Sequence, residues 1–434
     1  MNEKTKMKVV WICEVSNSML RRHLDLKIPF WHKFIRYFLG GSFEKELSDY
    51  AQWNTNALKE FESVDDVDLH VIFTHSAMRK KYQTFTENSI NYYAVSKGDT
   101  SIVSFIKFHL FRKKPNFNMT HKTIADLVNK IQPAIIHIMG AENPSYSLSI
   151  RVLPNNIPII VQLQTMLHDP IAIQAYPYLK YQKDCEYQVL NRADYIGTSV
   201  ITFPKIVREH IKKDPVIINT SIMIAEKANL LEHEKQYDFV YFANYISKSL
   251  DLVVEAFGIA YNRNSSLTLD IIGGGNSLQI EELNKRLDAL CCKDAVTIEG
   301  KLPTHNDVIS QIRKARFALL PLKIDVVSST IREAMWNGLP VVTTITSGTP
   351  SLNRVRESVL LSPIGDHEAL ASNMLRLVNE PDLAKRLRNN AAITVDEMFG
   401  NNSQRAHEWE EAYQACIENF NNGTPLPENM INKN

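Results

Sequence analysis

Residues 325–344 read Asp325-Val-Val-Ser-Ser-Thr-Ile-Arg-Glu333-Ala-Met-Trp-Asn-Gly338-Leu-Pro-Val-Val-Thr-Thr344, and this stretch predicts most of a βαβ unit. An apolar strand at residues 317–320 precedes it, a helix carries Glu333 in its opening turns, and a second strand begins after Gly338. Gly338 ends the helix, because a residue without Cβ adopts the left-handed conformation at little cost. Ligands of parallel α/β sheets bind at the carboxyl ends of the strands, where helix N-termini point. Asp325 and Glu333 are therefore candidate ligand contacts.

Short apolar runs recur along the chain with helical stretches between them. They are near-continuous in Val, Ile and Leu, which is typical of parallel strands buried on both faces. Helices are predicted at residues 249–261 and 279–290. Alternating strands and helices indicate parallel α/β sheets, and 434 residues are too many for one core. The predicted strands are residues 8–13, 68–73, 134–139, 157–163, 194–198, 238–243, 267–272, 295–299, 317–320, 339–343 and 358–361.

The composition is that of an ordinary globular protein, with 44% hydrophobic and 22% charged residues. No apolar run approaches the ~20 residues that span a bilayer. The first residues lead straight into a strand, so no secretory signal is expected. Five cysteines without a Cys-x-x-Cys pair fit reduced thiols. We therefore expect a cytoplasmic protein, at most docked on the inner face of the cell membrane, with no nucleic-acid partner.

Several segments, in order along the chain, resemble glycosyltransferase family 4, the retaining sugar transferases of GT-B fold. The Asp325–Glu333 spacing resembles the family's Glu-x7-Glu segment, with Asp in place of the first Glu. Residues 243–257, Ala-Asn-Tyr-Ile-Ser-Lys248-Ser-Leu-Asp and onward, resemble the family's Gly-Arg…Lys-Gly segment. Further matches are Gly273-Gly-Gly275, Val-Thr-Ile-Glu-Gly300 and Gly365-Asp-His-Glu-Ala-Leu.

The resemblance implies two Rossmann-like parallel-sheet domains that face a central cleft. Residues 1–222 would bind the acceptor and residues 223–402 the nucleotide sugar. Residues 403–434 would form a helix that returns to the first domain, followed by a disordered tail; Trp409 and Tyr413 lie four residues apart in this helix.

The resemblance also implies roles for donor-binding residues. Glu333 would hold the ribose hydroxyls, Asp325 would face the transferred sugar, and Lys248 would neutralise the leaving diphosphate. Asn244 stands where the family has an arginine, so Arg332 or a basic residue of the first domain is a candidate helper. Ser328, Ser329 and Thr330 are expected to precede the helix. The diphosphate would lie against backbone N–H groups there, and the three side chains serve equally well as ordinary helix caps. Gly273 and Gly274 would allow close approach of the nucleotide.

In the first domain, the family often places a histidine after the strand matched by residues 157–163. Gln164 occupies that position and His168 follows it, and either is a candidate contact for the sugar or the acceptor. His168 is equally well interpreted as a surface-loop residue. His137 lies in the middle of a strand and is more simply a core histidine. The loop after the first strand has no glycine, so a dinucleotide motif is absent there.

No metal or other cofactor is expected. The one Asp-x-Asp, Asp66-Val-Asp68, precedes its strand and is interpreted as solvated charge. Two stretches, residues 27–38 and 105–114, mix aromatic and basic side chains in residues 1–220, which hold 28 Lys+Arg against 21 Asp+Glu. They suit an anionic membrane surface, although amphipathic helices packed on their own sheet explain them as well.

The sequence thus predicts a retaining glycosyltransferase that moves a sugar from a nucleoside-diphosphate sugar to a hydroxyl of a glycan or lipid-linked acceptor, in surface-polysaccharide assembly. Two alternatives remain open. One is a GT-B sugar-nucleotide epimerase, and the other is a non-catalytic homologue that binds nucleotide sugars. The donor base, sugar, acceptor and oligomeric state are not encoded in any motif.

Overall fold

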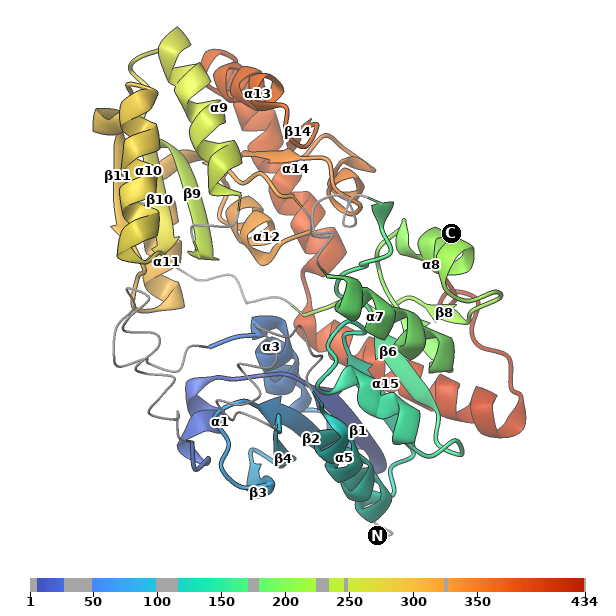
Figure 1. Ribbon diagram of the computed structural model, residues 1–434. Coiled ribbons are helices and arrows are strands. Elements are labelled where there is room, and N and C mark those ends of the chain that lie inside the picture. The colour runs from blue at the N-terminus through green and yellow to red at the C-terminus, as the bar shows by residue number, and fades with distance from the viewer. Residues whose placement is uncertain are drawn as a thin grey trace. The chain divides into compact units, whose positions relative to one another are not determined.

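A computed structural model describes residues 6–26, 49–98, 116–170, 179–223, 234–245, 249–323 and 327–432. These residues form two compact units (Figure 1). The first contains the described residues up to 223 together with 401–432, and the second contains those from 234 to 400. Each unit has its own mainly parallel sheet with helices, which confirms the predicted α/β class. Within the described residues, no helix has the length and apolarity needed to cross a bilayer.

The first unit is built on an eight-stranded sheet of order β3-β4-β2-β1-β5-β6-β7-β8. Paired strands are parallel except for β3, which is antiparallel to β4. The strand order reverses between β1 and β5, and ligands of such sheets bind beyond the carboxyl ends of the strands at that point. The strands are β1 (Met7–Cys13), β2 (Val67–His75), β3 (Tyr82–Glu87), β4 (Ile90–Ser96), β5 (Ile135–Met139), β6 (Ile159–Gln162), β7 (Tyr195–Gly197) and β8 (Ile217–Ile218).

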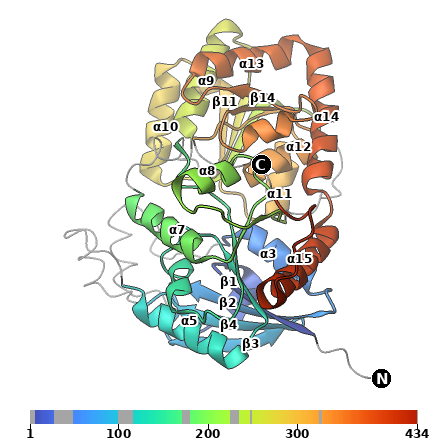
Figure 2. The ribbon, with the colours of Figure 1, turned by 90° about the vertical axis from the view of Figure 1, so that its right-hand side faces the viewer.

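The C-terminal helix α15 (Asn402–Asn422) belongs to the first unit, and Figure 2 shows it beside α3 (Gln52–Phe61). Its Tyr413 hydroxyl accepts a hydrogen bond from Trp11 Nε1 at 2.9 Å and bonds His137 Nδ1 at 2.8 Å. These buried side chains tie α15 to β1 and β5, and His137 is the core histidine that its position predicted. The other helices of this unit are α1 (Ser18–Arg22), α5 (Asn118–Ile131), the 3-10 helix η1 (Ser147–Val152), α7 (Lys180–Arg192) and α8 (Phe203–His210).

The second unit has a six-stranded, fully parallel sheet of order β11-β10-β9-β12-β13-β14. Its strands are β9 (Tyr237–Tyr245), β10 (Leu269–Gly274), β11 (Val296–Gly300), β12 (Ala315–Leu319), β13 (Val341–Thr344) and β14 (Leu360–Ser362). Its helices are α9 (Leu250–Arg263), α10 (Ser277–Ala289), α11 (His305–Ile312), α12 (Ser329–Trp336), α13 (His367–Asn379) and α14 (Pro381–Phe399), with short 3-10 turns η2 (Lys293–Ala295) and η3 (Thr349–Asn353).

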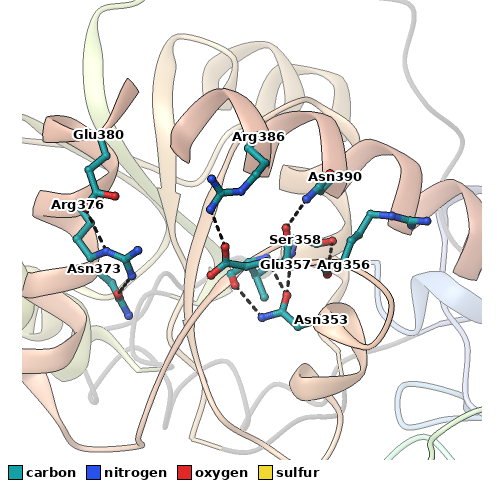
Figure 3. Close-up of polar contacts among 10 residues, drawn as sticks. Asn353, Arg356, Glu357, Ser358, Asn373, Arg376, Glu380, Arg386 and Asn390 are labelled. Atoms are coloured by element: carbon teal, nitrogen blue, oxygen red, sulfur yellow. Dashed lines mark hydrogen bonds and ion pairs between the residues drawn. The ribbon is translucent and has the colours of Figure 1, made fainter. Parts of the chain in front are cut away.

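Polar contacts hold the loop between η3 and β14 against α14 (Figure 3). The Asn353 side chain accepts from the N–H of Ser358 at 2.8 Å and so closes the loop on itself. On the α14 side, Asn390 donates to the Glu357 carbonyl at 2.8 Å, and Arg386 forms an ion pair with the Glu357 carboxylate at 3.0 Å. The loop that leads into β14 is therefore fixed by backbone-directed bonds as well as by charge.

Each strand predicted from the sequence is present, with ends that shift by at most a few residues. Strands β3, β4 and β8 were not predicted. β3 has an alternating pattern of exposed and half-buried residues, because it is antiparallel at the sheet edge, and β8 is only two residues long. The tail expected to be disordered is instead described as far as Asn432. The backbone N–H of Asn219 donates to the Met430 carbonyl at 2.7 Å, so the tail covers the free edge of β8.

Candidate functional site

Glu333 lies in the second unit, on α12, which follows the carboxyl end of β12. Its side chain is 19% exposed. Burial raises the pKa of the Glu333 carboxyl to about 7, against the opposing effect of the positive charge of Arg332. His305, at the start of α11, brings Nε2 to 4.0 Å from the Glu333 carboxylate, and burial lowers the pKa of His305. A half-buried carboxyl of this kind is poised to accept hydrogen bonds that replace lost water.

The first turn of α12 differs in one respect from the sequence-based expectation. Ser328 is the N-cap, and its Oγ accepts from the N–H of Ile331 at 3.3 Å and lies 2.8 Å from Thr330 Oγ1. Ser329 and Thr330 lie inside the helix and do not precede it, because the helix begins directly after its cap. Gly338 has φ of 73° and follows the helix, as predicted.

The glycines of the second unit lie where the sequence placed them. Gly273 and Gly274 end β10, and Gly275 connects them to α10. Asn276 caps α10 in a reciprocal capping box with Gln279, whose N–H donates to Asn276 at 2.9 Å. The loop therefore runs from a buried strand directly to a helix N-terminus, the arrangement that suits a nucleotide phosphate.

Arg332, proposed as a helper cation, has a buried side chain. Its guanidinium carbon lies 5.1 Å from the ring centroid of Phe399, at the end of α14. This cation–π contact packs α12 against α14, so Arg332 has a structural role whether or not it also assists the donor.

Several predicted residues lie outside the part of the chain that the structure describes. These are Lys248 and Asp325, the side chain of Asn244, and both basic-aromatic stretches, residues 27–38 and 105–114. Asn244 itself lies in β9. Two described residues close to Lys248 and Asp325 in the sequence form an ion pair: Lys323 Nζ lies 2.8 Å from the Asp251 carboxylate. That pair ties the start of α9 to the loop after β12.

In the first unit, Gln164 follows β6 and its Nε2 donates to the Met139 carbonyl at 3.2 Å. Gly140 follows β5 with φ of 106°, and a Cβ built there would lie 3.4 Å from both Gln164 Nε2 and Glu142 Oε2. Burial, and to a smaller extent the negative charge of Glu186, raises the pKa of Glu142 to about 7. Polar groups therefore meet at the carboxyl ends of β5 and β6.

His168, the other first-unit candidate, is not an unsupported surface residue. Its Nδ1 lies 2.6 Å from Oε1 of Glu186, a fully buried residue of α7. The loop after β1 carries Glu14, which accepts from Asn143 at 2.6 Å and forms an ion pair with Lys97. A carboxylate replaces the glycine-rich turn there, so this loop does not favour a phosphate group.

Sequence reasoning missed Glu142, Glu186 and His305. Glu142 could have been found from the sequence, since it lies two residues after Gly140, the glycine that follows a predicted strand. His305 and Glu186 could not, because each becomes relevant only through a side chain that is distant in the sequence.

Comparisons with known proteins agree with this architecture. Residues 223–394 match the family model for glycosyl transferases group 1. Among solved structures, sucrose-phosphate synthase from Thermosynechococcus elongatus has a TM-score of 0.66 at 15% identity, covering 94% of this chain and 98% of that one. A UDP-forming α,α-trehalose-phosphate synthase from Burkholderia vietnamiensis has a TM-score of 0.62 at 10% identity, covering 94% and 100%. The lipopolysaccharide outer core galactosyltransferase WaaB has a TM-score of 0.59 at 12% identity, covering 93% and 98%. A search of curated protein sequences returned no match. The GT-B fold expected from the sequence is thus confirmed.

Proposed function

We propose that this protein catalyses a retaining sugar transfer in surface-polysaccharide assembly. Its residues 223–394 match the family model for glycosyl transferases group 1, and its fold is GT-B. The family match over these residues supports a glycosyltransferase that acts with a nucleotide sugar. The retaining course, membership of family 4, and a glycan or lipid-linked acceptor are our proposals. One structural neighbour acts on lipopolysaccharide and another is named as UDP-forming, which supports this acceptor class and a UDP-sugar.

The observation that carries the proposal is the Glu333 carboxyl on α12. A carboxylate accepts hydrogen bonds from two adjacent hydroxyls, and the ribose of a nucleotide presents such a pair. In the proposal, Glu333 binds the ribose, while N–H groups at the start of α12 and the glycines at the end of β10 contact the diphosphate. Lys248 and Asp325 keep the roles that the family resemblance implies, against the leaving diphosphate and the transferred sugar.

Front-face transfer would account for retention of the anomeric configuration without a protein nucleophile. The bond from the anomeric carbon to the diphosphate oxygen breaks, and the acceptor oxygen bonds to the same face of that carbon. The leaving diphosphate oxygen takes the acceptor's proton. The protein then has to orient both sugars, stabilise the diphosphate charge and exclude water.

We propose that no metal is required. Asp68, of the single Asp-x-Asp, lies near the amino end of β2 and bonds His70 Nε2 at 3.2 Å. It is therefore at the end of the strand opposite the edge where ligands of parallel sheets bind. Addition of EDTA should leave transfer unchanged, and a requirement for added Mg²⁺ or Mn²⁺ would refute this part.

Peripheral docking on an anionic membrane through residues 27–38 and 105–114 is a further part of the proposal. The excess of basic residues in residues 1–220 supports it. Flotation with anionic liposomes should fall when the basic residues of both stretches are replaced by Glu, and unchanged flotation would contradict docking.

Thermal stabilisation by UDP, GDP, ADP, CMP and their sugars tests the donor site. One diphosphate should raise the melting temperature in proportion to the logarithm of its concentration, and Glu333→Ala should abolish that rise. Glu282→Ala is the matched control, since Glu282 is an exposed glutamate on α10 of the same unit. If none of the nucleotides changes the melting temperature, the proposed donor site is wrong. Donor turnover without an acceptor would favour an epimerase, and binding without turnover a non-catalytic homologue.

A further inference from the structure

The His168 side chain is held by a buried carboxylate, which also holds the loop on which His168 lies. Glu186 is a fully buried residue of α7. Its Oε2 accepts from the N–H of Leu167 at 2.7 Å, and its Oε1 accepts from the N–H of His168 at 3.0 Å. The same Oε1 lies 2.6 Å from His168 Nδ1. A single carboxylate thus fixes both the loop after β6 and the orientation of the imidazole ring.

These contacts decide which ring nitrogen carries the proton. Both Glu186 oxygens accept from backbone N–H groups, and an ionised carboxylate offers only acceptors to the ring. Nδ1 is then the donor to Oε1, and in the neutral ring the lone pair remains on Nε2. The His168 side chain is 11% exposed, so the ring is held by its neighbours with part of its surface towards solvent.

The surroundings of the ring suit a sugar. Tyr187 follows Glu186 on α7, is 47% exposed, and places its ring centroid 6.2 Å from that of His168. An exposed aromatic face beside a hydrogen-bonding group matches a ligand with apolar C–H groups and hydroxyls on adjacent surfaces.

We propose that Glu186 is a positioning residue, which locks His168 in the Nδ1–H form so that Nε2 accepts a hydrogen bond from a sugar hydroxyl. This inference rests on the proposed glycosyltransferase function, because it gives His168 its sugar ligand. A purely structural Glu186, needed only to hold the loop at Leu167, is the competing explanation, and the two differ in what they predict for His168.

The first test is nitrogen NMR of the wild-type protein labelled with ¹⁵N-histidine, at about pH 8.5 where an ordinary imidazole is neutral. The two ring forms give distinct nitrogen shifts, and His168→Gln identifies the signal by its loss. The expected result is the Nδ1–H form at His168. An Nε2–H form overturns the proposal. This measurement needs neither a folded Glu186 variant nor catalytic activity.

The second test is a double-mutant cycle on sugar transfer. Glu186→Gln should lower kcat by roughly 10–100-fold, the loss expected for one charge-assisted hydrogen bond, with little change in the KM for the donor. In a His168→Gln background the same substitution should have almost no further effect, because its target is gone. Additive losses in the double variant would show that Glu186 acts through the loop and overturn the proposal. Glu209→Gln, an exposed change on α8, is the control.

The two tests separate failure of this inference from failure of the proposed function. A wild-type protein without transfer activity refutes the proposed function, while the NMR signal still decides the state of the His168 ring. An active protein with additive losses keeps the function and rejects the role of Glu186.

Discussion

Replacing Glu333 by glutamine removes an ionisable carboxyl from a position where burial raises its pKa from 4.5 to about 7. The unfolded chain releases this proton near pH 4.5, whereas the folded protein retains it to about pH 7. Below pH 4.5 both states are protonated, and the carboxyl has no effect on the pH dependence. As pH rises from 4.5 to about 7, the carboxyl ionises in the unfolded chain first, so the folded protein loses stability relative to the unfolded chain.

The size of the effect follows from the pKa difference. Each unit is worth about 1.4 kcal/mol, which gives an upper limit of about 3 kcal/mol above pH 7. One fifth of the Glu333 side chain is exposed, so solvent reduces the effect, and about 1–3 kcal/mol is expected. Glutamine has nearly the same shape and no charge. Glu333→Gln should therefore stabilise the ligand-free protein by this amount at pH 8.5 and by almost nothing at pH 5, relative to wild type.

The assay is thermal or urea unfolding of both proteins at pH 5 and pH 8.5, with and without UDP. For a unit of this size, 1 kcal/mol corresponds to roughly 2–4 °C in melting temperature. The stabilised variant should at the same time lose most of its response to UDP, because an amide cannot accept two hydroxyls as a carboxylate does. Glu282→Gln, exposed on α10, should change neither quantity.

Two results would refute the reasoning in different places. If the stability difference between wild type and Glu333→Gln were the same at both pH values, burial would not raise the pKa of the Glu333 carboxyl. If the variant kept the full UDP response, Glu333 would not bind the ribose, whatever its protonation. Gain of stability with loss of nucleotide binding is the pattern expected of a functional carboxyl.

Three further changes test the first unit. Tyr413→Phe should lower the free energy of unfolding in urea by about 2–4 kcal/mol, since it leaves buried Trp11 Nε1 and His137 Nδ1 without their partner, and an unchanged midpoint would contradict the α15 contact. Burial lowers the pKa of His137 to about 3, so stability should fall as pH drops below about 6.5, and His137→Asn should make that fall shallower in pH-dependent melting curves. Gly140→Ala should cost about 2–3 kcal/mol of stability and reduce transfer, because φ is 106° and its Cβ would lie 2.8 Å from the Tyr146 hydroxyl; wild-type melting and activity would refute this.

Local sequence was sufficient for most of the fold. The central strands of both sheets, such as β1, β5, β10 and β13, are buried along most of their length, so each appears as a continuous apolar run, and the burial that makes the strand also makes the signal. Gly338 marked the end of α12 for the same local reason, because its φ of 73° suits a residue without Cβ. β3 escaped prediction, since an exposed edge strand has no such run. The position of Glu333 on α12 was readable as well, because one short segment contains the strand, the cap and the helix.

Only the tertiary structure decided which distant groups meet. Glu186 lies 18 residues from His168 along the chain and reaches it because α7 packs against the loop that follows β6. Tyr413 is 276 residues from His137, and their bond depends on the return of α15 to the first unit. Burial likewise raised the pKa of Glu333, and burial is a property of everything packed around a residue. Periodicity and capping are encoded within a few residues, whereas partners and local dielectric environment arise from the packing of the whole chain.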